Sequence, residues 1–190
     1  TLVGGALRTT ASFSTARTVA LGTGGGTLDV GAGSTLTTTG VVSGTSLTKI
    51  GGGTLALTAA NTYAGGTSLT VGTITVGNNS ALGNGALAMA GGTTLAAGAN
   101  NLALANLIST AGIGTVDTGA NAFTLNGVIS GPGSIAKIGS GNLFLNGANT
   151  YAGGTALTAG TIRVGNHAAL GSGAVTMSAG TTLQAGAPAL

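Results

Sequence analysis

Few side chains of this sequence could take part in acid–base chemistry. Asp29 and Asp117 are its two acidic residues, His167 is its single histidine, and cysteine is absent. A glycosidase needs two carboxylates about 5 to 9.5 Å apart. Asp29 and Asp117 occupy matching positions of an 88-residue internal repeat, which puts them four stacked strands, or about 19 Å, apart. No catalytic residue, cofactor site or metal site is therefore predicted.

The other charged or phosphate-binding patterns are interpreted structurally. His167 replaces Asn79 of the earlier repeat copy in a Gly-Asn corner, with no second histidine and no acid nearby. Asp29 is expected to form a weak exposed ion pair with Arg8, one strand away. Gly-x-Gly patterns such as residues 22–24 can belong to phosphate-binding loops. Here they are interpreted as turns, since no helix follows them to present its N-terminus to a phosphate.

Five larger side chains are candidate contact residues. Lys49 and Lys137 lie within the two long, 27-residue spacings between strands, where extra residues could bulge as a loop, and they are expected to be solvated charges. Tyr63 and Tyr151 each follow Asn-Thr at a corner and are expected to lay their rings over the turn, with the hydroxyl meeting backbone or water. Phe144 is expected to be the most exposed apolar side chain.

The composition excludes several classes of protein. The 190 residues include 39 Gly and 4% charged residues, and the three arginines and two lysines are scattered singly. No basic stripe exists for nucleic acid to bind. The mean hydropathy of +0.54 argues against disorder. Gly, Asn and Thr interrupt every apolar run before the roughly 20 residues that cross a bilayer. Because no Met or leader begins the chain, we interpret it as a fragment.

The dominant feature of the sequence is self-similarity. Residues 47–98 align with residues 135–186 without a gap, with 34 identities in 52 positions. Along the chain, a Thr-apolar-any-apolar pattern typical of a strand begins at Thr27, Thr54, Thr73, Thr115 and Thr161. The first apolar position of such strands recurs at a nearly regular interval, with Gly and Asn clusters between. These residues favour sharp corners.

A strand that returns at such an interval predicts a stack of rungs about 4.8 Å apart. The predicted fold is an all-β, right-handed parallel β-helix (β-solenoid) of about nine rungs, with an 88-residue superrepeat of four rungs and one segment over residues 1–190. Alternation sorts the residues into columns. The predicted inward column is Leu7, Leu28, Leu55, Ile74, Leu95, Val116, Leu143, Ile162 and Leu183.

The neighbouring outward column is a threonine ladder that includes residues 27, 54, 73, 94, 115, 161 and 182. An ice-binding face would need two adjacent threonine columns, and only Thr73 and Thr75 form such a pair in the predicted columns. The ladder is therefore interpreted as packing of β-branched side chains on a pleated surface.

Two segments carry a family resemblance. Residues 49–74 and 137–162 share Asn-Thr-Tyr-Ala-Gly-Gly-Thr, flanked by Gly-x-Leu-x-Leu and Gly-Thr-Ile. They resemble the autotransporter-associated β-strand repeat, also called the passenger-associated transport repeat. The resemblance implies a β-helical passenger, which a type V secretion system threads through an outer-membrane barrel and which folds outside the cell.

The expected function is therefore a non-enzymatic scaffold at the bacterial surface or in the medium, used for display or adhesion and in support of secretion. The expected partners are a host-surface or matrix receptor, a barrel domain outside this segment, and further copies stacked end to end, but no nucleic acid. The alternatives are a self-assembling extracellular filament or matrix protein, and a carbohydrate-active or ice-binding β-helix.

Overall fold

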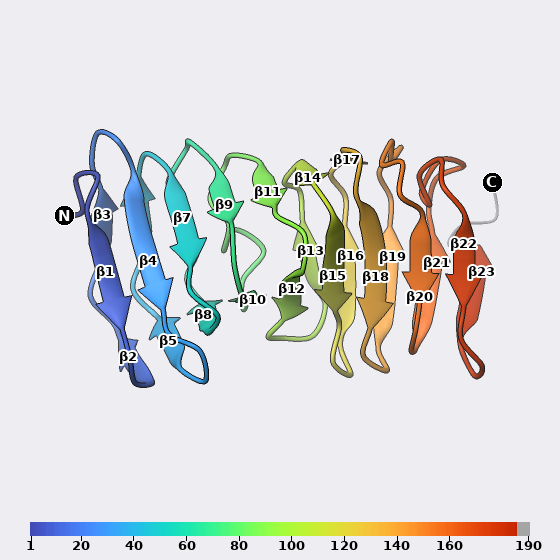
Figure 1. Ribbon diagram of the computed structural model, residues 1–190, viewed down its shortest axis with the longest axis horizontal. Helices are drawn as coiled ribbons and strands as arrows, with labels where there is room; N and C mark the ends of the chain where they lie inside the picture. Colours follow the sequence, from blue (N-terminus) through green and yellow to red (C-terminus); the bar gives the residue numbers. More distant parts are fainter. Residues whose placement is uncertain (186–190) are drawn as a thin grey trace.

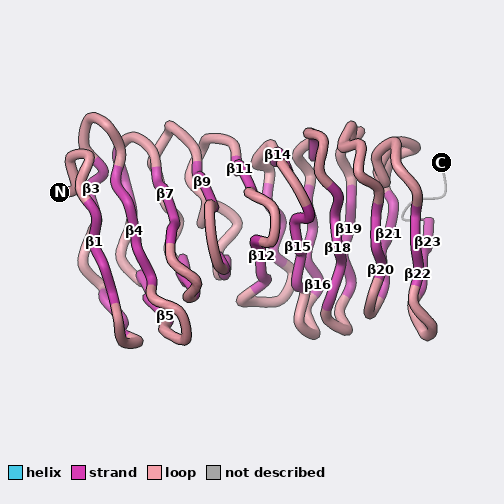
Figure 2. Tube along the Cα trace, viewed as in Figure 1, coloured by secondary structure: helices cyan, strands magenta, loops and turns pink. Residues whose placement is uncertain are grey.

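The chain forms one continuous rod of stacked turns. In the computed structural model, which describes residues 1–185, the described part contains strands and loops but no helix (Figure 2). The strands pair in parallel with those of the turns before and after, and the first and last turns lie at opposite ends of the rod (Figure 1). This confirms the all-β parallel solenoid of about nine turns. Its right-handed winding stays a prediction. Gly186, the end of the second predicted repeat copy, lies outside the described residues.

Three faces surround the rod. Face 1 is a seven-stranded sheet of β1 (Ala6–Thr9), β4 (Gly26–Val30), β7 (Leu47–Ile50), β9 (Thr67–Leu69), β11 (Leu87–Met89), β14 (Ile108–Thr110) and β17 (Ile129–Ser130). Face 2 is a nine-stranded sheet of β2 (Phe13–Thr15), β5 (Thr35–Thr38), β8 (Thr54–Leu57), β10 (Thr73–Val76), β12 (Thr93–Ala97), β15 (Ile113–Asp117), β18 (Ser134–Ile138), β20 (Thr155–Leu157) and β22 (Val175–Met177). We number the nine turns by these face 2 strands.

Face 3 is built from two sheets. They consist of β3 (Val19–Leu21) and β6 (Val42–Gly44), then β13 (Leu102–Leu104), β16 (Ala122–Leu125), β19 (Asn142–Leu145), β21 (Thr161–Val164) and β23 (Thr182–Ala185). Between the two sheets, residues 61–64 and 78–84 cross the face without forming strands. In turns 8 and 9, residues 149–151 and 166–171 cross face 1 in the same way.

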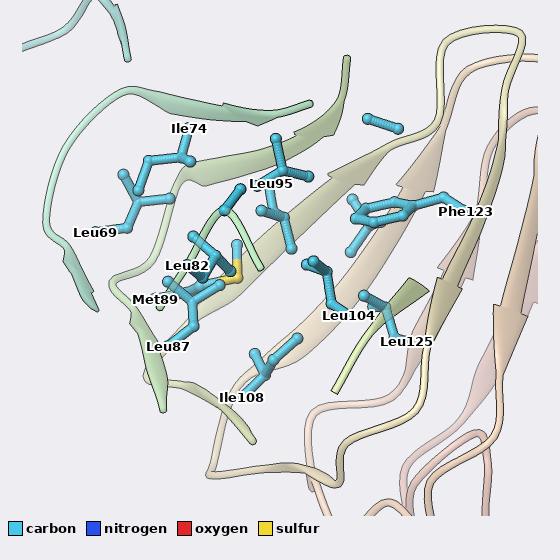
Figure 3. Packing of buried hydrophobic residues seen from close by; sticks show 14 of the residues in the cluster. Leu69, Ile74, Leu82, Leu87, Met89, Leu95, Leu104, Ile108, Phe123 and Leu125 are labelled. Atoms are coloured by element: carbon cyan, nitrogen blue, oxygen red, sulfur yellow. The ribbon is translucent and has the colours of Figure 1, made fainter. Parts of the chain in front are cut away.

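Side-chain alternation places the core inside the rod. In β8 and β10, every second residue is fully buried, whereas the residues between them are half-buried on the outer surface. Leucine, isoleucine, methionine and phenylalanine side chains from successive turns pack together along the axis, as the register partners Leu104 and Leu125 do in Figure 3. Each turn therefore buries its apolar residues only against the turns beside it.

The predicted single inward column is wrong, because its members lie on three faces. Leu28 is in face 1, Leu55 in face 2 and Leu143 in face 3. Leu55 pairs with Leu36 of the preceding turn rather than with Leu28. The 27-residue spacing thus consists of one ordinary turn, from Leu28 to its register partner Lys49, and the short segment that leads from Lys49 to Leu55 on the next face. There is no long turn with a bulge at these places.

The same geometry refines the 88-residue unit. Four turns of face 2 run from Leu55 to Lys137, which falls short of Leu143, the repeat equivalent of Leu55. One repeat therefore covers four turns and also reaches the next face. Accordingly β7 lies in face 1 while its copy β18 lies in face 2, and β8 lies in face 2 while its copy β19 lies in face 3. The two repeat copies face different sides of the rod.

The threonine ladder is confirmed on one face and is shorter than predicted. Face 2 carries five threonines in register, which are Thr35, Thr54, Thr73, Thr94 and Thr115. The adjacent outward column reads Thr37, Ala56, Thr75, Ala96 and Asp117. Thr35 and Thr37 thus form a second threonine pair that the predicted columns did not contain, but alanine separates the two pairs.

A charge placed inside the stack should be far more harmful than the same charge outside. Ile74→Asp would bury a carboxylate without a partner, so we expect it to lower the free energy of unfolding by about 3 kcal/mol or more. Leu145→Asp should behave alike. Ala56→Asp is the matched control, because residue 56 pairs with Thr75 on the outer surface, and it should change stability by less than about 1 kcal/mol. Urea denaturation followed by circular dichroism measures both, and equal losses would contradict the assignment of inside and outside.

Candidate functional site: the buried polar corners of the repeat

The structure does not bring the candidate acid–base residues together. Asp29 is in β4 on face 1 of turn 2, and Asp117 is in β15 on face 2 of turn 6. His167 is an exposed corner residue of turn 9. Within residues 1–185, no group of three His, Cys, Asp or Glu side chains could hold a metal ion. None of the described residues belongs to a helix that could span a membrane.

The predicted pairing of Arg8 with Asp29 is confirmed. Arg8 Nε lies 3.4 Å from Asp29 Oδ2, and the two residues are direct register partners in β1 and β4. Because the arginine side chain is 72% exposed, solvent screens this ion pair and its contribution to stability is small.

The expectation that Lys49 and Lys137 are solvated is wrong. Both side chains are fully buried inside the rod. Lys49 Nζ donates hydrogen bonds to the carbonyl oxygens of Ile50, Gly51 and Val71, at 2.9, 2.6 and 3.1 Å. The first two oxygens belong to the corner after β7, and the third belongs to the same corner of the next turn. The ammonium group therefore joins two successive turns.

The second copy repeats this arrangement atom for atom. Lys137 Nζ donates to the carbonyl oxygens of Ile138, Gly139 and Ala159, at 3.0, 2.7 and 3.0 Å. Three hydrogen bonds satisfy all three donors of an ammonium ion. Such bonds are what allows a charged group to be buried, since an unpaired buried charge would be very unfavourable. We call these two sites the lysine corners.

Burial changes the acidity of both lysines. Desolvation lowers the pKa of Lys49 from 10.5 to about 8, and the negative charge of Asp29 opposes this change. Lys137 behaves in the same way, with a pKa of about 8, lowered by desolvation and raised by Asp117. At neutral pH both amines carry their positive charge, and all three carbonyl oxygens of each corner have a donor.

A second buried group is the asparagine of the shared Asn-Thr-Tyr motif. Asn61 Oδ1 accepts a hydrogen bond from the Val42 amide of turn 2 at 2.8 Å, and its Nδ2 donates to the Ala81 carbonyl of turn 4 at 2.6 Å. One side chain in turn 3 thus bridges the turns on both sides. Asn149 does the same between Ile129 and Ala169, at 2.7 and 2.6 Å.

The tyrosine of the motif lies inside the rod rather than over the turn. Tyr63 is fully buried, and its hydroxyl lies 2.6 Å from Thr67 Oγ1. Thr67 Oγ1 donates to the Leu82 carbonyl, so it accepts from the tyrosine. A Cβ at Gly83, where φ is +62°, would come within 2.9 Å of the tyrosine ring, so the next turn needs glycine there.

The second tyrosine has equivalent contacts. Tyr151 is fully buried, its hydroxyl bonds Thr155, and Thr155 donates to Leu170 at 3.1 Å. The predicted position of both rings over the turn is therefore wrong, and the predicted backbone or water partner of the hydroxyl is replaced by a threonine hydroxyl.

Phe144 is not the most exposed apolar side chain. It is half-buried, and the guanidinium of its register partner Arg163 lies over its ring, 5.4 Å from the centroid. Ile113 and Leu107, which are 60% and 59% exposed, are far more accessible. Arginine stacking on the neighbouring turn is what covers the ring.

The outer surface offers shallow grooves without reactive groups. One, of about 370 Å³, lies over face 1 and is lined by small side chains such as Ser68, Ala88 and Ser109. Another, of about 300 Å³, lies beside the exposed Leu107 and is lined by Asn79, Asn84 and Asn106. No titratable side chain lines either groove, so neither supports catalysis.

The lysine corners could have been found from the alternation alone. Leu47 and Lys49 are two positions apart in one strand, as are Ile135 and Lys137, so their side chains point to the same side of the sheet. An inward leucine or isoleucine therefore implies an inward lysine. The residue type argued for solvent, and the false 27-residue turn supported it. Asn61 gave no such signal, because residues 58–66 lie outside a strand.

The two repeat copies agree inside and differ outside. Of the 20 residues that are buried between positions 47 and 98, 18 are identical in the second copy, and the other two are exchanged for similar aliphatic residues, Leu47 for Ile135 and Leu87 for Val175. The other 16 of the 18 differences fall at residues that are not buried, such as Ala56 for Phe144 and Thr75 for Arg163. The repeat therefore preserves its interior more strictly than its surface, where 16 of the 32 positions that are not buried are identical.

The pKa shifts predict how stability depends on pH. Between pH 8 and 10.5 the unfolded chain keeps the lysine protons that the folded chain has lost, so the free energy of unfolding should rise in this range. Burial also raises the pKa of Tyr63 from 10.0 to about 12 and raises that of Tyr151. Above about pH 10 the unfolded tyrosines ionise first, so stability should then fall.

We therefore expect maximal stability near pH 10, measured as the urea midpoint at a series of pH values. The variant with Lys49→Met and Lys137→Met should lose the rising limb and keep the falling one, whatever its absolute stability. A wild-type midpoint that is flat or falls from pH 8 to 10 would contradict the buried state of the lysines.

Comparison with known proteins agrees with this repeat. The family profile described as Passenger-associated-transport-repeat matches residues 47–76 and 135–164, which contain both lysine corners and both Asn-Thr-Tyr motifs. The chain is also similar to the Adhesin BmaC autotransporter of Brucella suis biovar 1 (strain 1330), with 41% identity over 58 residues. The matched part covers 30% of this chain and 2% of that protein. No solved structure matches the chain.

The resemblance of the two segments is thus confirmed by both comparisons. The chain carries two segments that match the passenger-associated-transport-repeat family, and over 58 residues it is similar to an autotransporter adhesin.

Proposed function

We propose that this segment is a non-enzymatic rod of the passenger, in which the repeat holds successive turns together after export and leaves the outer surface free to vary. The observation that carries this proposal is the agreement of the two copies at buried positions and their divergence outside. A repeat that bound a shared ligand would preserve outward residues instead.

The corners supply what a stacked chain lacks between its strands. In a strand, backbone groups pair with the turns on either side, whereas in a corner the chain changes direction and carbonyl groups lose regular partners. Lys49 and Asn61 provide donors for such carbonyls of their own turn or the next one. The contacts to the next turn form only when that turn is in place, so the corners favour complete stacking over a collapsed, irregular chain.

This role suits a chain that is exported unfolded. The protein has no cysteine, so no disulfide can form before or during passage. Its stability must come from contacts made on stacking, which a chain outside the cell can form without an energy source. Support of type V secretion is then a consequence of folding on the outer side, with a barrel domain elsewhere in the full-length protein as the partner.

Adhesion would depend on outward residues. The related Brucella protein is named an adhesin, and 16 of the 32 positions that are not buried in the first repeat copy differ in the second. A receptor at a host surface or in a matrix would therefore bind features of one turn or face, such as the stacked Arg163 and Phe144, rather than the repeat as such.

Self-association is the second candidate function. Each strand inside the rod pairs in parallel with strands of the neighbouring turns, and a second copy stacked on an end of the segment would continue the same pairing. Sedimentation of the 190-residue segment over a range of concentrations tests this, since a monodisperse monomer at all concentrations would contradict it.

An export experiment tests the main proposal. In the full-length protein, Asn61→Leu together with Asn149→Leu keeps the side-chain size but removes the bridges between turns. We expect a several-fold loss of protease-resistant passenger at the cell surface, because two backbone groups per site lose their partner.

The matched control changes only the outside. Ala56→Phe together with Thr75→Arg gives the first copy the outward pair of the second, and surface display should stay at the wild-type level. The proposal is wrong if the exterior exchange abolishes display while the asparagine variants are exported and folded normally.

A further inference from the structure

Each buried lysine follows an aspartate that lies one turn earlier in the stack. Asp29 is in β4 and Lys49 in β7, which pair in parallel, and Asp117 is in β15 and Lys137 in β18, which also pair. The family match begins at residues 47 and 135, so it contains the lysines but neither aspartate. The two acidic residues of the whole chain thus stand at the same place relative to its two lysines.

The contacts at the corner glycine bring the carboxylate beside the lysine's carbonyl partners. Gly51, whose oxygen accepts from Lys49, has φ +77°, and a Cβ on it would lie 2.5 Å from Asp29 Oδ1. Gly139 has φ +80°, and its Cβ would lie 2.7 Å from Asp117 Oδ1. The aspartate therefore packs on the outer side of the corner whose inner side the ammonium group holds.

We propose that Asp29 and Asp117 are positioning residues of the repeat, each of which stabilises the ammonium ion of the buried lysine in the next turn, so that the functional unit begins one turn before the matched motif. The inference rests on the stacking role proposed above. It assigns a role to the two aspartates for which no catalytic chemistry is available.

The two corners differ in one neighbouring charge. Arg8 pairs with Asp29 from turn 1, whereas the register partner of Asp117 on that side is Ala96, the repeat equivalent of Arg8. The strands on the far side of the lysines, β9 and β20, carry no charged residue. The charged groups that face each corner are thus Arg8 and Asp29 for Lys49, and Asp117 alone for Lys137.

The test uses the fact that Lys49 and Lys137 are the only lysines of the chain. With ¹³C-labelled lysine, NMR shows two Cε signals, which Lys49→Met and Lys137→Met assign. In the wild type both signals should titrate near pH 8 rather than near 10.5. In Asp117→Asn, the midpoint of Lys137 should fall by about 0.5 to 1 pH unit, a 3- to 10-fold loss of proton affinity, while Lys49 stays unchanged.

A charge exchange provides the matched control. Arg8→Ala should raise the midpoint of Lys49, because Asp29 is then released from its competing partner, and Ala96→Arg should lower that of Lys137 by giving Asp117 such a partner. Both changes are on the outer surface. Asp29→Asn should lower the midpoint of Lys49, which keeps the proposal testable if Asp117→Asn does not fold.

A purely structural role of the aspartates would give a different result. Asp117 Oδ1 also accepts from the Gly119 amide at 2.8 Å, and loss of that bond alone would lower stability without moving the lysine midpoint. Midpoints that do not respond to either aspartate variant or to the charge exchange would overturn the inference. That outcome would leave the stacking role intact, because surface display measures it separately.

Discussion

The fold depends on contact between successive turns. No turn of this rod could keep its structure alone, because its strands are short and pair only with strands of other turns. Long-range pairing replaces local structure throughout. Stability must therefore be cooperative along the axis, in the manner of other solenoids, and every feature of the sequence has to be compatible with the turn before and the turn after.

The corners are where this constraint is hardest to meet. Strands satisfy their backbone groups by pairing, but a sharp corner inside a narrow rod leaves carbonyl and amide groups that water cannot reach. This chain places buried polar side chains there, and each of them reaches into another turn. Lys49 supplies three donors, Asn61 one donor and one acceptor, and Tyr63 a hydroxyl relayed through Thr67. These groups form a small part of the interior, and they are the part that makes the register of the stack specific.

Much of the fold could be predicted from alternation and spacing, and the errors have a common origin. The strands, their parallel stacking and the number of turns follow from a strand pattern that recurs at a nearly regular interval. The assignment to faces does not, because the longer spacing between Leu28 and Leu55 looks like one long turn when it is a turn plus a move to the next face. The spacing of strands along the chain does not tell on which face of the rod each strand lies. It therefore predicts one column for two leucines that lie on different faces.

The buried corners show a second limit. Residue type and position give opposite predictions for Lys49. Its charge predicts a solvent-exposed side chain, whereas its place two residues after the inward Leu47 predicts a buried one. Position was the better guide, because three carbonyl oxygens compensate the charge. The hydrogen bonds of Asn61 could not be predicted, since Asn61 itself lies outside a strand and its partners, Val42 and Ala81, belong to the preceding and following turns. Such contacts become visible only once the turns are in register.

The offset between repeat copies separates two requirements on the sequence. Because one repeat carries the chain through four turns and on to the next face, equivalent corners lie on different sides of the rod. The interior of a three-faced rod offers the same environment to each face, so the buried residues can be kept from copy to copy. The outer surface offers no such equivalence, and residues there need only tolerate their neighbours. A repeat of this kind can therefore be extended along a rod without imposing the same surface on every side, which is the property that a scaffold with a variable exterior requires.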